Sequence, residues 1–264
     1  MISQIPQTEE TVLTDLSDGV LTITLNRPDK RNALTHQMID AVSMLIRWAG
    51  HESSVRCLLI AGRGKAFCAG DDLNGLGPLL GIEQNESTEM DAYQSVVLAL
   101  LRLRKPSVAA VNGPAHGGGM EFALACDLRI GATGANFGPA TTSLGGSAFT
   151  TLLPLYVGVA QARKILYLSK PIDSTSALSL GLLDEVVSED EVAGAARALA
   201  VELAAGPTRA YGLIKHALLL GAAPHAFASL LIEEEYTRSA LTTADAREGL
   251  VAYAEKRPPN FIGE

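Results

Sequence analysis

In the first half of the chain, segments with the apolar pattern of β-strands alternate with segments whose apolar positions recur at helical spacing. Residues 12–14 and 20–25 flank a Ser-Asp-Gly turn, and the second arm alternates apolar with polar side chains, which predicts a β-hairpin. Short continuous apolar runs at 57–61, 108–111 and 128–130 predict strands that are buried on both faces. The chain therefore supplies a hairpin and a set of buried strands.

Helices are predicted between these strands. Thr35 is a suitable N-cap, and the apolar positions that follow it recur at helical spacing until Gly50 ends the run. A second set of apolar positions at helical spacing lies between Met90 and Leu101. This alternation of strands and helices favours an α/β layered structure with buried strands.

The second half of the chain has a helical composition. From about residue 161 onward, Ala, Leu, Glu, Lys and Arg dominate, and Ala193–Ala205 is typical of an amphipathic helix. These apolar faces are too extensive for helices standing free in water. They must pack on the first half, on each other or on a neighbouring subunit. We expect an α/β core at residues 1–200 followed by a helical region at residues 201–264.

Composition narrows the class of protein. The chain has 264 residues, 47% of them apolar, and its 29 acidic and 21 basic side chains leave a formal net charge of -8. This apolar content excludes fibrous and disordered chains. The negative charge argues against broad electrostatic binding to nucleic acid or to an anionic membrane.

The cysteines and histidines offer no disulfide or metal-binding pattern. Cys57, Cys68 and Cys126 form no Cys-x-x-Cys pair, and the five histidines show no metal-ligand spacing. Residues 1–7 lack the basic and apolar regions of a signal peptide, and no apolar run approaches the span of a bilayer. We therefore expect a cytoplasmic protein with reduced thiols, no metal and no membrane segment.

Three partial motifs depart from their full patterns, and of the three classes only the phosphate loop is excluded outright. The Gly-Arg-Gly-Lys sequence at 62–65 is no phosphate loop, because the first glycine is missing and Ala66 replaces the hydroxyl residue. Residues 145–149 resemble the nucleophile elbow of serine hydrolases until Phe149 stands where glycine is required. The three glycines at 117–119 lack the spacing of dinucleotide-binding loops.

Two glycine-rich turns form the candidate chemical site. Residues 65–73 and 112–121 each follow a buried strand, and the glycines at 117–119 remove every Cβ where a helix is about to begin. A backbone N–H from each turn would make a pair of donors around one oxygen. Such an oxyanion hole suits a thioester carbonyl that becomes an enolate. Glu121 follows in the first helical turn, within reach of the same reacting centre.

Each of these features, taken singly, also has a structural explanation. Glycines after a strand often serve tight packing, and Glu121 could simply complement the helix dipole at the surface. Asp71 and Asp72 could be N-caps. The joint occurrence of the two turns and the glutamate favours the catalytic interpretation.

The chain resembles the enoyl-CoA hydratase/isomerase family, the crotonase superfamily, over nearly its whole length. The resemblance rests on five ordered segments at residues 25–34, 65–73, 112–127, 181–187 and 248–261. It implies an α/β crotonase-like (ClpP/crotonase) fold, a spiral of ββα units with a C-terminal helical trimerisation region.

The resemblance also implies roles for individual residues. The backbone N–H groups of Asp71 and Gly118 would be the oxyanion donors, and Glu121 would be a catalytic glutamate. The expected acyl-CoA contacts are Lys30, Arg31, Ala33, Ala69, Asp71, Asp72, Leu73, Asn74, Gly117, Gly118 and Lys256. Lys256 would reach a CoA phosphate on an adjacent subunit of a homotrimer or dimer of trimers. No cofactor is implied, because coenzyme A enters as part of the thioester substrate.

The sequence departs from the hydratase pattern at the second catalytic glutamate. Ala140 stands at that position and cannot transfer a proton, and the loop that follows is shortened to residues 144–148. Three interpretations stay open. The chain is an enoyl-CoA hydratase or lyase, a double-bond isomerase that uses Glu121 alone, or a CoA-binding homologue that has lost its chemistry.

Overall fold

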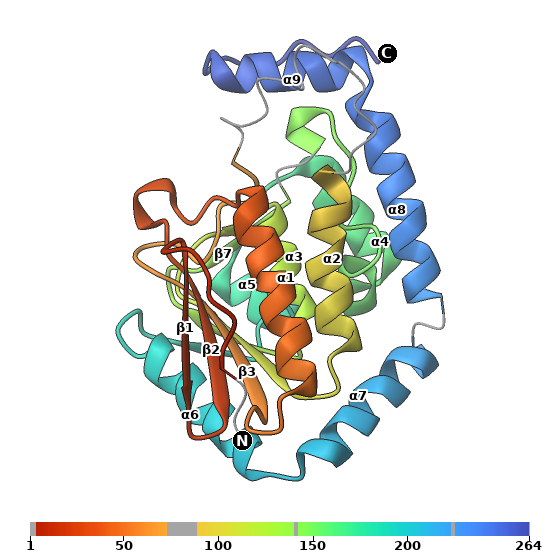
Figure 1. Cartoon of the computed structure of the whole chain (residues 1–264). Helices are drawn as coiled ribbons and strands as arrows, with labels where there is room; N and C mark the ends of the chain where they lie inside the picture. The colour runs from red at the N-terminus through yellow and green to blue at the C-terminus, as the bar shows by residue number, and fades with distance from the viewer. Residues whose placement is uncertain (1–3, 73–88, 140–141, 223–224, 264) are drawn as a thin grey trace.

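A computed structural model describes residues 4–72, 89–139, 142–222 and 225–263 (Figure 1). A twisted β-sheet forms the middle of the main body, and helices cover both of its faces. The last helix and the C-terminus lie beyond one end of this body, at the top of Figure 1. Within the described residues, no helix is both long and apolar enough to cross a membrane.

The main sheet has the strand order β1-β2-β3-β4-β6-β9. The first pair is antiparallel and all other neighbouring pairs are parallel. Its strands are β1 (Val12–Ser17), β2 (Val20–Leu25), β3 (Cys57–Gly62), β4 (Ser107–Val111), β6 (Leu128–Ala132) and β9 (Glu185–Val187). The predicted hairpin and the three predicted buried strands are thereby confirmed. The helical composition after residue 161 does not predict β9, which completes the sheet.

Two of the predicted helices pack side by side against one face of the sheet. They are α1 (His36–His51) and α2 (Glu89–Arg102) (Figure 1). The side chain of Thr35 accepts a hydrogen bond from the N–H of Met38, which confirms the predicted N-cap. The sequence predicts that this helix ends at Gly50. The helix instead continues to His51.

The opposite face of the sheet is covered by α6 (Val192–Ala205). Its buried positions, Val192, Ala196, Ala200 and Ala204, recur every four residues, which confirms the amphipathic prediction. The small alanines let this helix lie close to β3 and β4. The expected boundary between residues 200 and 201 lies inside this helix.

A second, smaller sheet lies beside the first. Its strand order is β5-β7-β8, with β5 (Ala115–His116), β7 (Asn136–Gly138) and β8 (Ile172–Asp173). The remaining helical elements before the C-terminal part lie outside the two sheets. They are η1 (Pro28–Lys30), α3 (Gly118–Ala125), η3 (Thr142–Leu144), α4 (Leu153–Leu168) and α5 (Ser174–Ser179).

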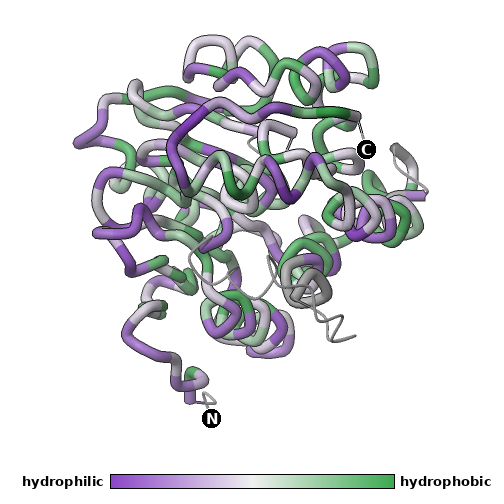
Figure 2. Tube along the Cα trace, turned by 90° about the horizontal axis from the view of Figure 1, so that it is seen from above, coloured by the Kyte–Doolittle hydropathy of each residue, from purple (hydrophilic) through white to green (hydrophobic). Residues whose placement is uncertain are grey.

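The C-terminal part is helical, as expected. Its helices are α7 (Thr208–Ala222), α8 (Ala226–Leu241) and α9 (Ala244–Ala254). Figure 2 shows hydrophobic residues on the outside of the molecule as well as in its interior. The exposed ones on α7 and α8 include Leu213, Ile214, Leu218, Leu220, Leu231, Ile232 and Tyr236.

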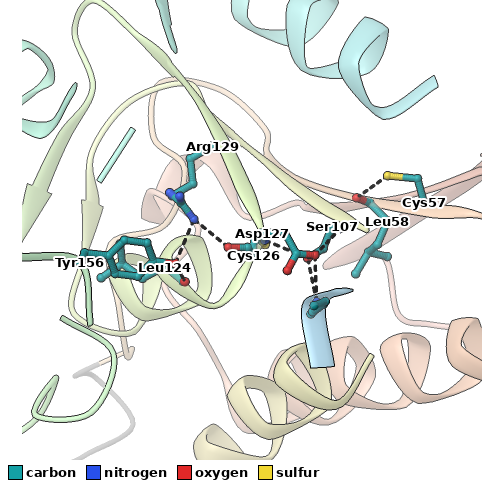
Figure 3. A network of polar contacts seen from close by, with 9 residues as sticks. Cys57, Leu58, Ser107, Leu124, Cys126, Asp127, Arg129 and Tyr156 are labelled. Carbon is teal, nitrogen blue, oxygen red and sulfur yellow. Dashed lines mark hydrogen bonds and ion pairs between the residues drawn. The ribbon is translucent and has the colours of Figure 1, made fainter. Parts of the chain in front are cut away.

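A polar cluster joins α7 to the core. Asp127 accepts hydrogen bonds from the N–H and hydroxyl of Ser107, both at 2.8 Å, and forms an ion pair with Lys215 at 2.9 Å. Figure 3 shows Asp127 beside Ser107 at the start of β4, with Arg129 stacked near Tyr156. The cluster joins α7 to the amino end of β4, at the end of the strand away from the second glycine turn.

Candidate active site

Two neighbouring parallel strands deliver the two glycine-rich turns. β3 leads into the first turn and β4 leads into the second, and these strands pair in parallel register. Because the carboxyl ends of parallel strands lie at the same edge of a sheet, both turns emerge together. The fold therefore places side by side two segments that are far apart in the sequence.

The backbones of the two turns touch. The N–H of His116 donates to the carbonyl of Cys68 at 2.9 Å. Gly70 has a φ of +91°, and a Cβ added there would lie 3.0 Å from the carbonyl oxygen of His116 and 3.3 Å from the nitrogen of Gly118. Both the positive φ and the close approach favour glycine at position 70.

The first turn is also held on its other side. Leu34 donates its N–H to Gly70 at 2.8 Å, and Asp72 donates its N–H to Leu34 at 2.9 Å, so that Leu34 and Asp71 form a parallel bridge. In a parallel bridge of this kind, Leu34 bonds to the two residues on either side of Asp71, and the N–H of Asp71 itself points away from Leu34. The N–H of Asp71 therefore faces away from Leu34, on the side where the second turn lies.

The second turn runs directly into α3. Gly117 precedes the helix with a φ of +50°, and the N–H groups of Met120 and Glu121 donate to its carbonyl. Gly118 is the first residue of α3, so its N–H has no acceptor within the helix. A Cβ on Gly119 would lie 2.3 Å from the carbonyl oxygen of Cys68, which explains why the third glycine is needed.

Glu121 is buried at the first turn of α3. Its exposed fraction is 1%, and every residue of the helix is buried. The alternative that Glu121 is a surface residue which only complements the helix dipole is therefore wrong. A carboxyl group is costly to bury, so its presence beside two glycine turns points to chemistry rather than to solubility.

The two neighbouring aspartates have different surroundings. Asp72 pairs with Arg27 at 2.8 Å, and the same guanidinium donates to the carbonyl of Ala33 at 2.6 Å. The side chain of Asp71 is exposed to solvent. Burial by the surrounding protein nevertheless raises the pKa of Asp71, while a hydrogen bond from its own N–H and the charge of His36 lower it less.

Asn32 and Arg27 shape the site but are absent from the predicted contacts. Asn32 is fully buried with a φ of +57°. Its side chain accepts from the N–H of Arg27 and donates to the carbonyls of Arg63, Ala66 and Phe67. The sequence gives only a weak indication of this role for Asn32. It stands in a charged loop before an Ala-Leu pair, and local sequence does not show which side chain of the loop is buried.

Most of the predicted acyl-CoA contacts lie around the first turn. Lys30 and Arg31 are exposed, Ala33 is half-buried, and Ala69 donates its N–H to the carbonyl of Arg31 at 2.9 Å. These residues share a rim with Asp71 and Asp72, and Gly117 and Gly118 lie in the adjoining turn.

The remaining predicted contacts are Lys256, Leu73 and Asn74. Lys256 follows α9, and its N–H donates to Tyr253; no contact between described residues joins its side chain to Lys30 or Arg31. Leu73, Asn74 and Ala140 lie outside the described residues.

A cavity of about 340 Å³ lies elsewhere, between the η3 loop and the C-terminal segment. It is lined by Thr142, Gly145, Gly146, Thr243, Asp245, Phe261 and Gly263. None of these residues belongs to the glycine turns. Within the part of the chain that the structure describes, no three His, Cys, Asp or Glu side chains are grouped as a metal site would require.

Comparison with known proteins decides the family. The family model for enoyl-CoA hydratase/isomerase matches residues 15–264, which is nearly the whole chain. The chain belongs to this family, the crotonase superfamily. It is accordingly an enzyme of the hydratase/isomerase class, and the resemblance drawn from its five segments is confirmed.

The relatives of this crotonase-family chain carry names of both reaction types. It is 35% identical to a 1,2-epoxyphenylacetyl-CoA isomerase of Escherichia coli, over 97% of this chain and 99% of the relative. It is also 35% identical to a probable enoyl-CoA hydratase of Rhodobacter capsulatus, over 96% and 98% of the two chains.

Solved structures of the family confirm the fold. An enoyl-CoA hydratase/isomerase of Pseudoalteromonas atlantica superposes with a TM-score of 0.86 at 28% identity, over 96% of this chain and all of the other. An enoyl-CoA hydratase of Mycobacterium avium subsp. paratuberculosis gives 0.85 at 29% identity, over 96% and 98%. The expected crotonase-like α/β fold with a helical C-terminal region is therefore correct.

Proposed function

We propose that this enzyme stabilises the enolate of an acyl-CoA thioester and most simply hydrates an enoyl-CoA. One observation carries the proposal. The two turns lie against each other, since a Cβ on Gly70 would be 3.3 Å from the nitrogen of Gly118, and the buried Glu121 follows in the first turn of α3; this supports a pair of donors made by the N–H groups of Asp71 and Gly118.

The chemistry follows from these groups. The thioester oxygen would accept hydrogen bonds from both N–H groups, which offset the negative charge that develops on it. The amino end of α3 adds a favourable partial positive charge. Glu121 would then move one proton, either from an attacking water or from a carbon of the substrate.

Binding of the CoA portion is proposed from exposed cations. Lys30 and Arg31 stand on the rim beside Ala69 and can meet the phosphates of CoA, although the net charge of the chain is negative. Lys256 would add a contact from an adjacent subunit. The exposed apolar faces of α7 and α8 support a homotrimer or a dimer of trimers. We infer a cytoplasmic enzyme that uses no cofactor beyond its substrate.

A double-bond isomerase is the second candidate. It is favoured by alanine at position 140, which leaves Glu121 as the expected proton carrier. The relative of Escherichia coli, 35% identical, is also named an isomerase, although its named substrate is an epoxide, 1,2-epoxyphenylacetyl-CoA. In that reaction one carboxylate removes a proton from one carbon and returns it to another.

The first test is turnover of trans-2-enoyl-CoA thioesters of graded chain length. We expect loss of the conjugated-thioester absorbance with the wild-type enzyme, and a fall in kcat of about 10²-fold or more in Glu121→Gln. Glu202→Gln, which removes an exposed glutamate on α6, is the matched control and should retain wild-type kcat.

The other interpretations give different outcomes. Incorporation of solvent deuterium into the substrate without net addition of water would support the isomerase. A wild-type enzyme that is inert on every chain length contradicts hydration. CoA thioesters that bind by calorimetry without any turnover would instead support the CoA-binding homologue.

A further inference from the structure

The carboxyl end of α3, the helix that begins at the second glycine turn, is held by side chains from two other elements. The hydroxyl of Tyr156, in the first turn of α4, donates to the carbonyl of Leu124 at 2.6 Å. Arg129, on β6, donates from Nη1 to the carbonyl of Cys126 at 2.7 Å. The last carbonyls of a helix lack partners within it, so these two bonds satisfy buried groups at its end.

The two donors also contact each other. Nη1 of Arg129 donates to the hydroxyl oxygen of Tyr156 at 3.2 Å, and the guanidinium lies 4.8 Å from the centre of the tyrosine ring (Figure 3). Arg129 is 2% exposed, and its backbone N–H and Nη2 donate to one carboxylate oxygen of Asp184, at 2.7 and 3.1 Å. The directions of these bonds fix the orientation of the guanidinium, and through it that of the tyrosine hydroxyl.

Both side chains remain hydrogen-bond donors at neutral pH. Burial, as the largest cause, raises the pKa of Tyr156, whereas the charge of Arg129 lowers it by less. The hydroxyl therefore stays protonated and keeps its proton for Leu124. A guanidinium is always charged in proteins, and a positive charge beside the carboxyl end of a helix complements the partial negative charge there.

The amino end of α3 is held through backbone groups. Gly117, which precedes the helix, has no side chain with which to cap it; its N–H donates to the carbonyl of Gly138, and its own carbonyl accepts from Met120. All eight residues of α3 are buried, but apolar packing is non-directional and by itself sets neither the rotation of a helix nor its position along its axis. The directional bonds at the carboxyl end supply both.

We propose that Tyr156 and Arg129 are positioning residues for the groups at the other end of α3. The inference rests on the proposed function, in which the N–H of Gly118 and the carboxyl group of Glu121 act on the substrate. Leu124 lies three residues after Glu121, one helical turn away, and the whole of α3 is only about 12 Å long. A displacement at its carboxyl end therefore reaches both groups, and a misplacement of about 1 Å can cost about 10²-fold in rate.

The first experiment compares Tyr156→Phe with the wild type on crotonyl-CoA and longer enoyl-CoA thioesters. The variant keeps the ring beside Arg129 and removes only the hydroxyl. We expect kcat to fall about tenfold, with KM changed less than about twofold, because displaced catalytic groups act mainly in the transition state. Tyr167→Phe, at a tyrosine of the same helix that is 77% exposed, is the matched control and should keep wild-type kcat. All variants are assayed at a temperature where circular dichroism shows them folded.

The second experiment reads the position of the donors without turnover. Butyryl-CoA labelled with ¹³C at its carbonyl is saturated and cannot add water, and isotope-edited infrared spectroscopy gives its carbonyl stretching frequency when bound. Well-placed N–H donors polarise the carbonyl and lower this frequency. We expect a smaller lowering in Tyr156→Phe than in the wild type or Tyr167→Phe. Arg129→Lys, which keeps a cation but loses the fork that contacts Cys126, Asp184 and Tyr156 together, should change kcat and the frequency in the same direction.

The outcomes separate this inference from the proposed function. A folded Tyr156→Phe with wild-type kcat and wild-type carbonyl frequency overturns the positioning role, even if it is less stable, and leaves the proposed function intact. A wild type that is inert on every enoyl-CoA but lowers the carbonyl frequency contradicts hydration, and the frequency in the variants then decides the inference. A wild type that does neither contradicts both. If Tyr156→Phe does not fold, Arg129→Lys provides the comparison.

Discussion

A single buried amide side chain organises the first turn. Asn32 connects the loop that begins at Arg27 with the carbonyls of Ala66 and Phe67, which lead into the glycine turn. Its φ of +57° is a conformation that asparagine tolerates better than most residues. The position therefore requires both the hydrogen-bonding capacity and the backbone tolerance of this residue type.

Replacing this residue should destabilise the protein. Asn32→Ala removes the side-chain partner of the Arg27 N–H and of the Phe67 carbonyl and leaves the Ala66 carbonyl only a long bond from Asn112 at 3.4 Å, and we expect the free energy of unfolding to fall by about 3 kcal/mol. Urea denaturation monitored by circular dichroism measures the change. Asn26→Ala, at a half-buried site where the amide bonds the carbonyl of Glu10, is the control and should cost below about 1 kcal/mol. An equal loss in both variants would contradict the special role of Asn32.

Local sequence could predict elements but not the contacts between them. The N-cap at Thr35 and the strand at residues 57–62 depend on neighbouring residues, and both follow from periodicity and capping chemistry. The short strand β9 forms because β6 offers an unpaired edge, which no local pattern shows. Likewise, nothing in the adjacent pair of aspartates at 71 and 72 shows that the distant Arg27 pairs with Asp72.

The C-terminal segment after α9 is held by two carboxylates of that helix. Asp245 accepts from the N–H groups of Ile262 and Gly263, and Glu248 binds Arg257 and the N–H of Asn260. The hydrogen bond from Arg257, and then that from Asn260, lower the pKa of Glu248 from 4.5 to about 2. Because this folded pKa lies below the unfolded one, the contribution of Glu248 is fully present above pH 4.5 and is lost as the pH falls through about 2.

Removing this charge should release the segment. In Glu248→Gln at neutral pH, we expect the amides of Asn260 and Ile262 to exchange with solvent deuterium several-fold faster than in the wild type. Glu235→Gln, an exposed position on α8, should exchange as the wild type does. Unchanged exchange in Glu248→Gln would mean that Asp245 alone holds the segment.

The C-terminal helices of the molecule expose several large apolar side chains to solvent. Leu218 is 64% exposed on α7, and Leu231 and Tyr236 are 65% and 64% exposed on α8. Side chains of this size are stabilised when a second protein surface covers them, because their contact with water is unfavourable. The proposed trimer offers such a surface and would also bring Lys256 of one subunit toward the rim of another.

The assembly can be tested by sedimentation equilibrium. We expect the wild type to sediment as a trimer or hexamer, and the double variant Leu218→Glu with Leu231→Glu to shift toward smaller species, because charges replace the apolar contact. Glu202→Lys on the exposed face of α6 tests whether any surface charge change has this effect. A monomeric wild type at micromolar concentration would contradict the proposal.

The contact between Gly70 and Gly118 has a consequence for how the enzyme acquires activity. These glycines lie in the turns that follow β3 and β4, two strands that pair in parallel across the connection that contains α2. No fragment that carries one turn alone can form the site, and a nascent chain acquires it only once the second strand has been synthesised. A variant that loses this strand pairing should therefore be inactive even where its helices persist, so a normal helical signal alone does not report an assembled site.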